Sequence, residues 1–312
     1  MLTYKNILFA TLGTENDKDA LKQAVSIARN HKSSLTILLV SPVLDDEFSE
    51  YAQIIEGATK QQLDTQVAEV TKELGVDTSE IDLQVKQQAH VKPMVAIVQS
   101  VIKNEHDLLI KTSQQSNQRA GFKALDMELL RKCPCPVWLC KPIAAHREQI
   151  KVAVAIDAFD ATESGTELSV KLLKMARAQA NECDGKLRVI SNINTLMQSE
   201  FQHNVFLKLP QDKLDQQSTE VKSRHLDKLN ALVAESGIAG ELEIVQLQGT
   251  TDQTIPKYVS EHCVDILVMG TIARSGVAGV FIGNTAENII QQLDCSLLTV
   301  KPRGFISPVK TS

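Results

Sequence analysis

The chain has 312 residues, 43% hydrophobic and 23% charged, an ordinary globular composition that excludes disordered and fibrous proteins. Its 33 lysines and arginines against 38 aspartates and glutamates give a formal net charge of -5, so no basic field exists to hold a nucleic acid. The apolar runs are shorter than the roughly 20 residues of a membrane helix, and the first residues lack signal-peptide features. We therefore expect a cytoplasmic protein that binds neither nucleic acid nor membrane.

The first half alternates short apolar runs with stretches of helical spacing. The pattern predicts strands at 6–11, 35–40, 81–85, 107–110 and 136–140, and helices at 17–31, 60–74, 93–103 and 123–132. Strands that are short and apolar throughout are typical of a parallel sheet with helices on both faces.

The second half repeats this order. Strands are predicted at 151–156, 186–190, 241–247, 265–269 and 296–300, with helices at 163–180, 214–235, 252–261 and 284–293. The closing segments CPVWLCKP (135–142) and CSLLTVKP (295–302) align closely. The sequence thus predicts an α/β chain of two tandem doubly wound five-stranded parallel-sheet domains, at 1–145 and 149–304, and a tail at 305–312. The apolar segment 196–214 is left open between a lid, a partner groove and packing on the first domain.

Ligands of open doubly wound sheets bind beyond the carboxyl ends of the strands, here beside strands one and four. In the second half strand one runs into Asp157, and strand four into Gly270 and a glycine-rich loop with Gly276 and Gly283. The next helix opens near Asn284 and Thr285, and its free amides and positive dipole end favour an anion. The loop predicts a polyphosphate ligand.

The whole chain resembles a tandem universal stress protein, most similar to the E group of bacteria. The segments NILFA (6–10), LRKCP (130–134), the loop 270–285 and NTAE (284–287) carry the resemblance. ATP-binding members of this family have G-x-x-G-x9-G-[ST] after the fourth strand and an Asp after the first. The resemblance places that pattern on Gly270, Ala273, Gly283 with Asn284, and Asp157, and so implies ATP, alone or with Mg2+, in the second domain.

Two positions depart from the family pattern, with Ala273 for the second glycine and Asn284, next to Thr285, for the hydroxyl residue. Because Asn caps a helix about as well as Ser, we expect the helix start to remain intact. Arg274 is expected to face the same pocket as Asp157.

The first half has Leu12, Thr112 and Lys123 where the second has Asp157, Gly270 and Gly283. We therefore expect no nucleotide in the first domain, and no effect on the nucleotide from changing Gly121. The resemblance also implies that the two fifth strands meet edge to edge as an intrachain pseudo-dimer.

Other classes fit less well. Asp157, Asp160 and Lys301 suit a phosphotransfer receiver, but its phosphate-accepting Asp has no counterpart after the third strand. An adenylating enzyme needs a Ser-Gly-Gly loop after strand one, which 157–161 lacks. The Cys133 and Cys135 pair lacks neighbouring ligands for zinc.

No nucleophile with its base follows from the strand-end residues, so we expect no enzyme, although slow ATP hydrolysis stays open. The sequence favours a non-catalytic, ATP-binding stress-response protein that acts on an unknown protein partner and, by resemblance, in resistance to DNA-damaging agents. The alternative is a scaffold that binds a non-nucleotide metabolite, or no small ligand, and acts through protein partners.

Overall fold

The computed structural model describes residues 4–44, 49–77, 80–113, 120–193, 211–271 and 282–311. Arg274, Gly276 and nearly all of the segment 196–214 lie outside these ranges. None of the described helices is both long and apolar enough to cross a membrane.

The first half follows the predicted alternation of strands and helices. Its main elements are β1 (Asn6–Thr11), α1 (Lys18–His31), β2 (Ser34–Ser41), α2 (Ser49–Glu73), β3 (Leu83–Ala89), α3 (Pro93–Lys103), β4 (Leu108–Thr112), α4 (Ala124–Lys132) and β5 (Val137–Cys140). Helix α2 begins eleven residues before the predicted start at residue 60. Its first turns carry Tyr51, Ile54 and Ile55 at helical spacing, but these side chains are exposed rather than packed on the sheet.

The second half repeats the first. It comprises β6 (Val152–Ile156), α5 (Glu163–Asn181), β7 (Leu187–Ile193), α7 (Gln211–Ser236), β8 (Leu242–Gln248), α8 (Thr251–Glu261), β9 (Ile266–Gly270), α9 (Asn284–Gln292) and β10 (Ser296–Val300). The one-turn helix η4 (Arg147–Gln149) joins the halves.

The ten strands found among the described residues form one continuous sheet, in the order β3-β2-β1-β4-β5-β10-β9-β6-β7-β8. Pairing is parallel within each half and antiparallel between β5 and β10, where Trp138 lies opposite Leu298. The predicted pairing of the two fifth strands is therefore present. The strands of the first half run opposite to those of the second half. The carboxyl ends of the strands of one half therefore lie level with the amino ends of the strands of the other half.

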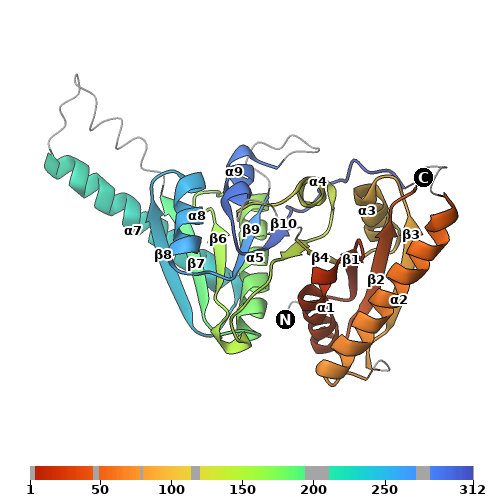
Figure 1. Cartoon of the computed structure of the whole chain (residues 1–312). Coiled ribbons are helices and arrows are strands. Elements are labelled where there is room, and N and C mark those ends of the chain that lie inside the picture. The colour runs from red at the N-terminus through yellow and green to blue at the C-terminus, as the bar shows by residue number, and fades with distance from the viewer. Residues whose placement is uncertain are drawn as a thin grey trace.

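Helices cover both faces of the sheet (Figure 1). One core layer contains buried side chains of α1 and α2 together with those of α5 and α7, and the other contains those of α3, α4, α8 and α9. Each layer therefore crosses the boundary between the halves. Figure 1 also shows α7 projecting from one end of the molecule and the C-terminal tail running to the first half, where the Gln99 amide donates to the Lys310 carbonyl at 3.0 Å.

Candidate functional site

A cavity of about 590 Å³ lies at the carboxyl ends of β6 and β9, where the strand order of the second half reverses. We call it the second-half cavity. Its buried lining side chains, such as Leu172, Ile255, Met269 and Ile289, are apolar and form its floor, whereas Asp157 is exposed at its mouth. It is lined by Ala155, Ile156, Asp157, Phe159, Asp160, Gly165, Leu168, Ser169, Leu172, Asn192, Thr251, Ile255, Met269, Gly270, Gly283, Thr285, Ala286 and Ile289.

Three helices contribute their first turns to this cavity. Gly165 belongs to the first turn of α5, Thr251 begins α8, and Thr285 is the second residue of α9. Helix N-termini carry the positive end of the helix dipole and, where no side chain caps them, unsatisfied amides. The Gly165 amide of α5 donates to the Thr162 hydroxyl at 3.0 Å, whereas α8 and α9 have no side-chain cap. Their convergence favours an anionic group at the mouth of the cavity.

Two carboxylates bring negative charge to the same cavity as these positive helix ends. The Asp157 Oδ1 atom accepts a hydrogen bond from the Phe159 amide at 3.0 Å, which fixes the turn after β6. The Asp160 Oδ1 atom accepts from the Thr162 hydroxyl at 2.6 Å. A Cβ at Gly165 would overlap the Asp160 carboxylate, so the glycine leaves room for it beside α5. Both acids line the cavity, where they can accept hydrogen bonds from ligand hydroxyl or amino groups.

Asn192, near the end of β7, forms another polar part of the wall. Its amide nitrogen donates to the Gly249 carbonyl at 2.6 Å, and its oxygen accepts from the Thr254 hydroxyl at 3.0 Å. Asn192 was not predicted from the sequence, because β7 also contains the polar residues Arg188 and Ser191 and no local pattern sets Asn192 apart. The sequence analysis also assigned no binding role to Asp160.

His225 of α7 lies behind the cavity wall and is fully buried. The Gln246 side-chain amide lies 2.8 Å from its Nδ1, and the Ser191 hydroxyl lies 3.0 Å from its Nε2. Since that amide nitrogen is a donor, Nδ1 accepts, and Nε2 carries the proton toward Ser191. Burial lowers the pKa of His225, so the neutral ring is favoured.

The structure gathers most of the predicted site residues. Asp157, Gly270, Gly283 and Thr285 line the second-half cavity. Asn284 is not the cap expected from the sequence. Gly283 is the N-cap, with φ -60° and ψ 141°, and Asn284 is the first residue of α9.

Gly270 also has a packing role, because a Cβ there would lie 3.0 Å from a methyl carbon of Leu168 in α5. Arg274 and Gly276 fall outside the described residues, so their predicted roles stay predictions.

The equivalent cavity of the first half is smaller, at about 250 Å³, and is lined by Leu12, Thr112 and Lys123, among others. Lys111 is the fourth residue of β4 and Asp126 the third of α4, so they correspond to Met269 and Ala286. The Lys111 ammonium lies 3.0 Å from an Asp126 oxygen, and both side chains are buried. A buried ion pair thus stands where the second half has two apolar cavity-lining residues.

Gly121 contacts the other half of the chain. Its φ is +86°, its amide donates to the Leu293 carbonyl at 2.8 Å, and a Cβ would lie 2.8 Å from the Gln291 carbonyl oxygen of α9. The left-handed backbone and this close approach both require glycine. The structure therefore argues against our expectation that Gly121 can be changed without effect on a nucleotide near α9.

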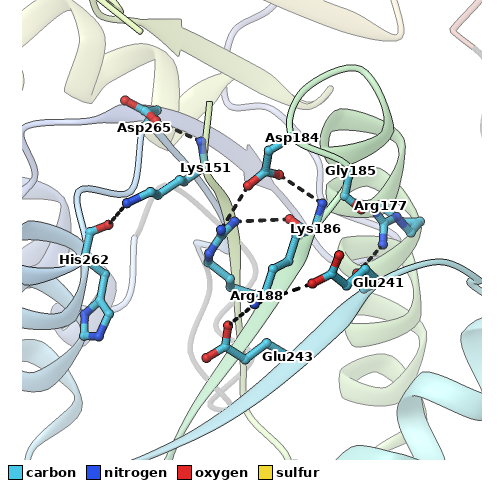
Figure 2. A network of polar contacts seen from close by, with 10 residues as sticks. All are labelled: Lys151, Arg177, Asp184, Gly185, Lys186, Arg188, Glu241, Glu243, His262 and Asp265. Atoms are coloured by element: carbon cyan, nitrogen blue, oxygen red, sulfur yellow. Dashed lines mark hydrogen bonds and ion pairs between the residues drawn. The ribbon is translucent and has the colours of Figure 1, made fainter. Parts of the chain in front are cut away.

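A polar network occupies the opposite edge of the second half, at the amino ends of its strands (Figure 2). Arg188 pairs with Asp184 at 2.9 Å, Lys186 pairs with Glu243 at 3.0 Å, and the Lys151 amide donates to Asp265 at 2.8 Å. Ligands of open α/β sheets bind at the carboxyl ends. We therefore read this network as structural.

Within the described ranges, no three histidine, cysteine, aspartate or glutamate side chains are grouped as a metal site. The Cys133 and Cys135 sulfurs lie 3.5 Å apart and are buried. Burial raises the pKa of the Cys135 thiol, which favours the protonated form over the metal-binding thiolate.

Comparison with known proteins gives a consistent family result. The model of the universal stress protein family matches residues 3–141 and again 151–301. Universal stress protein E of Photorhabdus laumondii is 30% identical over 100% of this chain and 99% of its own length. Universal stress protein E of Escherichia coli K12 is 27% identical over 99% of this chain and 98% of its own length.

Two solved structures share the fold. One is a protein of Pseudomonas aeruginosa PAO1 described as functionally unknown, with a TM-score of 0.68 and 24% identity over 96% of this chain and 93% of its own. The other is a universal stress protein of Archaeoglobus fulgidus, with a TM-score of 0.62 and 14% identity over 96% of this chain and 97% of its own.

Proposed function

Because the chain belongs to the universal stress protein family, with two such domains in tandem, we propose that it is a stress-response protein whose second domain binds ATP. The observation that carries the proposal is the second-half cavity, with its apolar floor, two carboxylates and three converging helix N-termini. The apolar floor suits an adenine ring. The amino end of α9 suits the phosphates.

The carboxylates Asp157 and Asp160 have complementary roles in this proposal. Each lines the cavity and can accept hydrogen bonds from the ribose hydroxyls or the adenine amino group. Gly283 allows the phosphates to approach the amides at the start of α9, because it places no side chain at the N-cap. Gly276 belongs to the proposed site as a glycine of the loop 270–285, Arg274 as a residue expected to face the same pocket as Asp157, and Asn284 through the backbone amide it contributes to the first turn of α9.

The proposal includes no catalytic step. Among the described residues, the hydrogen bond between Ser191 and His225 is the contact that most resembles a catalytic serine–histidine pair. These residues are 1% and 0% exposed, so a ligand in the cavity cannot reach them. The protein acts instead, in a cytoplasmic setting, by changing its interaction with a protein partner when ATP binds. A role in resistance to DNA-damaging agents is part of the same proposal.

The first test is whether the purified protein carries a nucleotide. Acid precipitation should release an adenine absorbance, and calorimetric titration of the emptied protein with ATP should give one site per chain. Repeating the titration with Mg2+ and with a chelator shows whether the metal contributes. Absence of both released adenine and binding heat would favour the scaffold that takes a different metabolite or acts through partners alone.

A further inference from the structure

We infer that Arg131, a residue of the first domain, strengthens phosphate binding in the second domain by neutralising Glu287. This inference rests on the proposed function and names a further residue of that site. Arg131 lies in the last turn of α4 and Glu287 in the first turn of α9. The Arg131 Nη2 atom lies 2.5 Å from the Glu287 Oε1 atom across the boundary between the halves.

The first half holds α9 at both ends. Arg131 pairs with Glu287 in its first turn. The carbonyl of Leu293, just after its last turn, accepts from the Gly121 amide and from the Lys141 ammonium, each at 2.8 Å. The amino end of α9 contributes Gly283 and Thr285 to the second-half cavity. First-domain residues therefore contact α9 at both ends, and Arg131 contacts the end that would receive the phosphates.

Glu287 has opposite effects with and without a bound phosphate. An acidic residue in the first turn stabilises a helix through the dipole, but the same charge repels an anion bound at that end. Its side chain is 28% exposed and that of Arg131 is 32% exposed, so water screens the pair only in part. By pairing with Glu287, Arg131 reduces the repulsion between this carboxylate and a bound phosphate, while Glu287 still stabilises the first turn of α9.

The halves are not symmetric at this contact. Met127 is the fourth residue of α4, as Glu287 is of α9, and Gln291 is the eighth residue of α9, as Arg131 is of α4. The reciprocal pair is therefore Met127 with Gln291, which carries no charge. A contact that served only to join the halves could have been kept on both sides of the pseudo-two-fold axis. The ion pair occurs at the helix whose start lines the larger cavity.

A double-mutant cycle tests the inference with ATP and with adenosine, which has no phosphate. Arg131→Gln should raise the Kd for ATP roughly two- to tenfold, the range expected for one charge near a helix N-terminus, and leave adenosine unchanged. Glu287→Gln should not weaken ATP. The double variant should bind ATP like Glu287→Gln, because the charge that Arg131 offsets is gone.

Arg147→Gln is the matched control, because Arg147 pairs with Glu182 just after the last residue of α5, at the end away from the cavity. It should change neither affinity. The inference is overturned if Arg131→Gln weakens ATP and adenosine equally, if it changes nothing, or if the double variant stays as weak as Arg131→Gln. Failure of the unmodified protein to bind ATP would overturn the proposed function and this inference together, whereas the other failures leave the proposed function standing.

Discussion

Lys141 and Lys301 occupy reciprocal positions and each closes a helix of the other half. The Lys141 ammonium donates to the Leu293 carbonyl after α9, at 2.8 Å, and the Lys301 ammonium donates to the Leu130 carbonyl of α4, at 2.5 Å. The Lys141 ammonium also lies 4.7 Å from the centroid of the Phe122 ring, and the Lys301 ammonium lies 4.3 Å from the centroid of the Phe305 ring. Cations near helix C-termini are favourable, so this exchange stabilises the boundary between the halves.

Lys301 should make the stability of the protein depend on alkaline pH. Burial lowers its pKa from 10.5 to about 8, so the unfolded chain binds more protons than the folded chain between these values. The free energy of unfolding should therefore rise from pH 8 to pH 10.5, by roughly 3 kcal/mol from this group. The buried thiols of Cys135, Cys140 and Cys295, whose pKa values burial raises, should lower the stability of every variant alike over this range. Chemical denaturation should therefore show the Lys301 contribution as a change of about that size in the difference between the unmodified protein and Lys301→Met from pH 8 to pH 10.5. Lys257→Met, at an exposed position, is the control and should follow the unmodified protein.

Asp157→Leu should weaken ATP by about 10- to 150-fold, since a hydrogen bond to a charged group contributes roughly 1.5 to 3 kcal/mol. Leu12 holds the corresponding position in the first half, so leucine suits the strand context there. Calorimetry should show the loss, and thermal melting without ligand should change little. Leu12→Ala is the control and should bind ATP normally. An unchanged affinity, or a large fall in melting temperature, would make Asp157 a structural residue.

Gly283→Val should abolish retention of ATP, because its branched side chain would stand at the closest approach to the α9 amides. The φ of -60° at Gly283 is accessible to valine, so the variant should fold. Lys123→Val, at the N-cap of α4, is the matched change in the first half and should retain ATP. Equal loss from both variants would contradict a site confined to the second domain. Gly121 is not a suitable control, because it packs on α9.

Lys111 and Asp126 should show strong coupling in unfolding measurements. Removing one partner of a buried pair leaves a charge without its counterion, so Lys111→Met or Asp126→Ala should cost roughly 3 to 5 kcal/mol. The double variant, which copies the Met269 and Ala286 pair of the second half, should lose much less than the sum. Additive losses would show that the two side chains act independently.

His225 should make the protein sensitive to mild acid. Because burial lowers its pKa below 6.5, the unfolded chain takes up the proton first, and stability should fall as the pH drops below about 6.5. His225→Gln should flatten this part of the stability curve, measured by urea unfolding from pH 7.5 to 5. His146→Gln, at an exposed position, should leave the curve unchanged. A variant curve parallel to that of the unmodified protein would contradict the buried-histidine account.

The alternation of elements was predictable because most of the strands are largely apolar and are separated by helical stretches, whereas the outer strands β3 and β8 carry several polar residues. The duplication was predictable from the shared ends of 135–142 and 295–302, which form β5 and β10 with the residues that flank them. Both signals are local in the chain. The lining role of Asp157 and Gly270 followed from the topology rule for parallel sheets, which needs only strand order.

The rest depended on contacts distant in sequence. Lys111 and Asp126 are 15 residues apart and meet only after β4 and α4 pack. Arg131 and Glu287 are separated by 156 residues. Asn192 contributes to the cavity through bonds to the start of α8, and Gly121 is constrained by a carbonyl of the other half. No local pattern marks these relationships.

The pairing of β5 with β10 has an evolutionary consequence. In a homodimer every substitution appears twice, so a change that closes one site closes both. Here a single polypeptide supplies both partners, and the halves have diverged at Lys111 against Met269 and at Asp126 against Ala286. Under the proposed function one half is free to specialise as a support while the other responds to ATP, and saturation would follow a simple hyperbola without cooperativity.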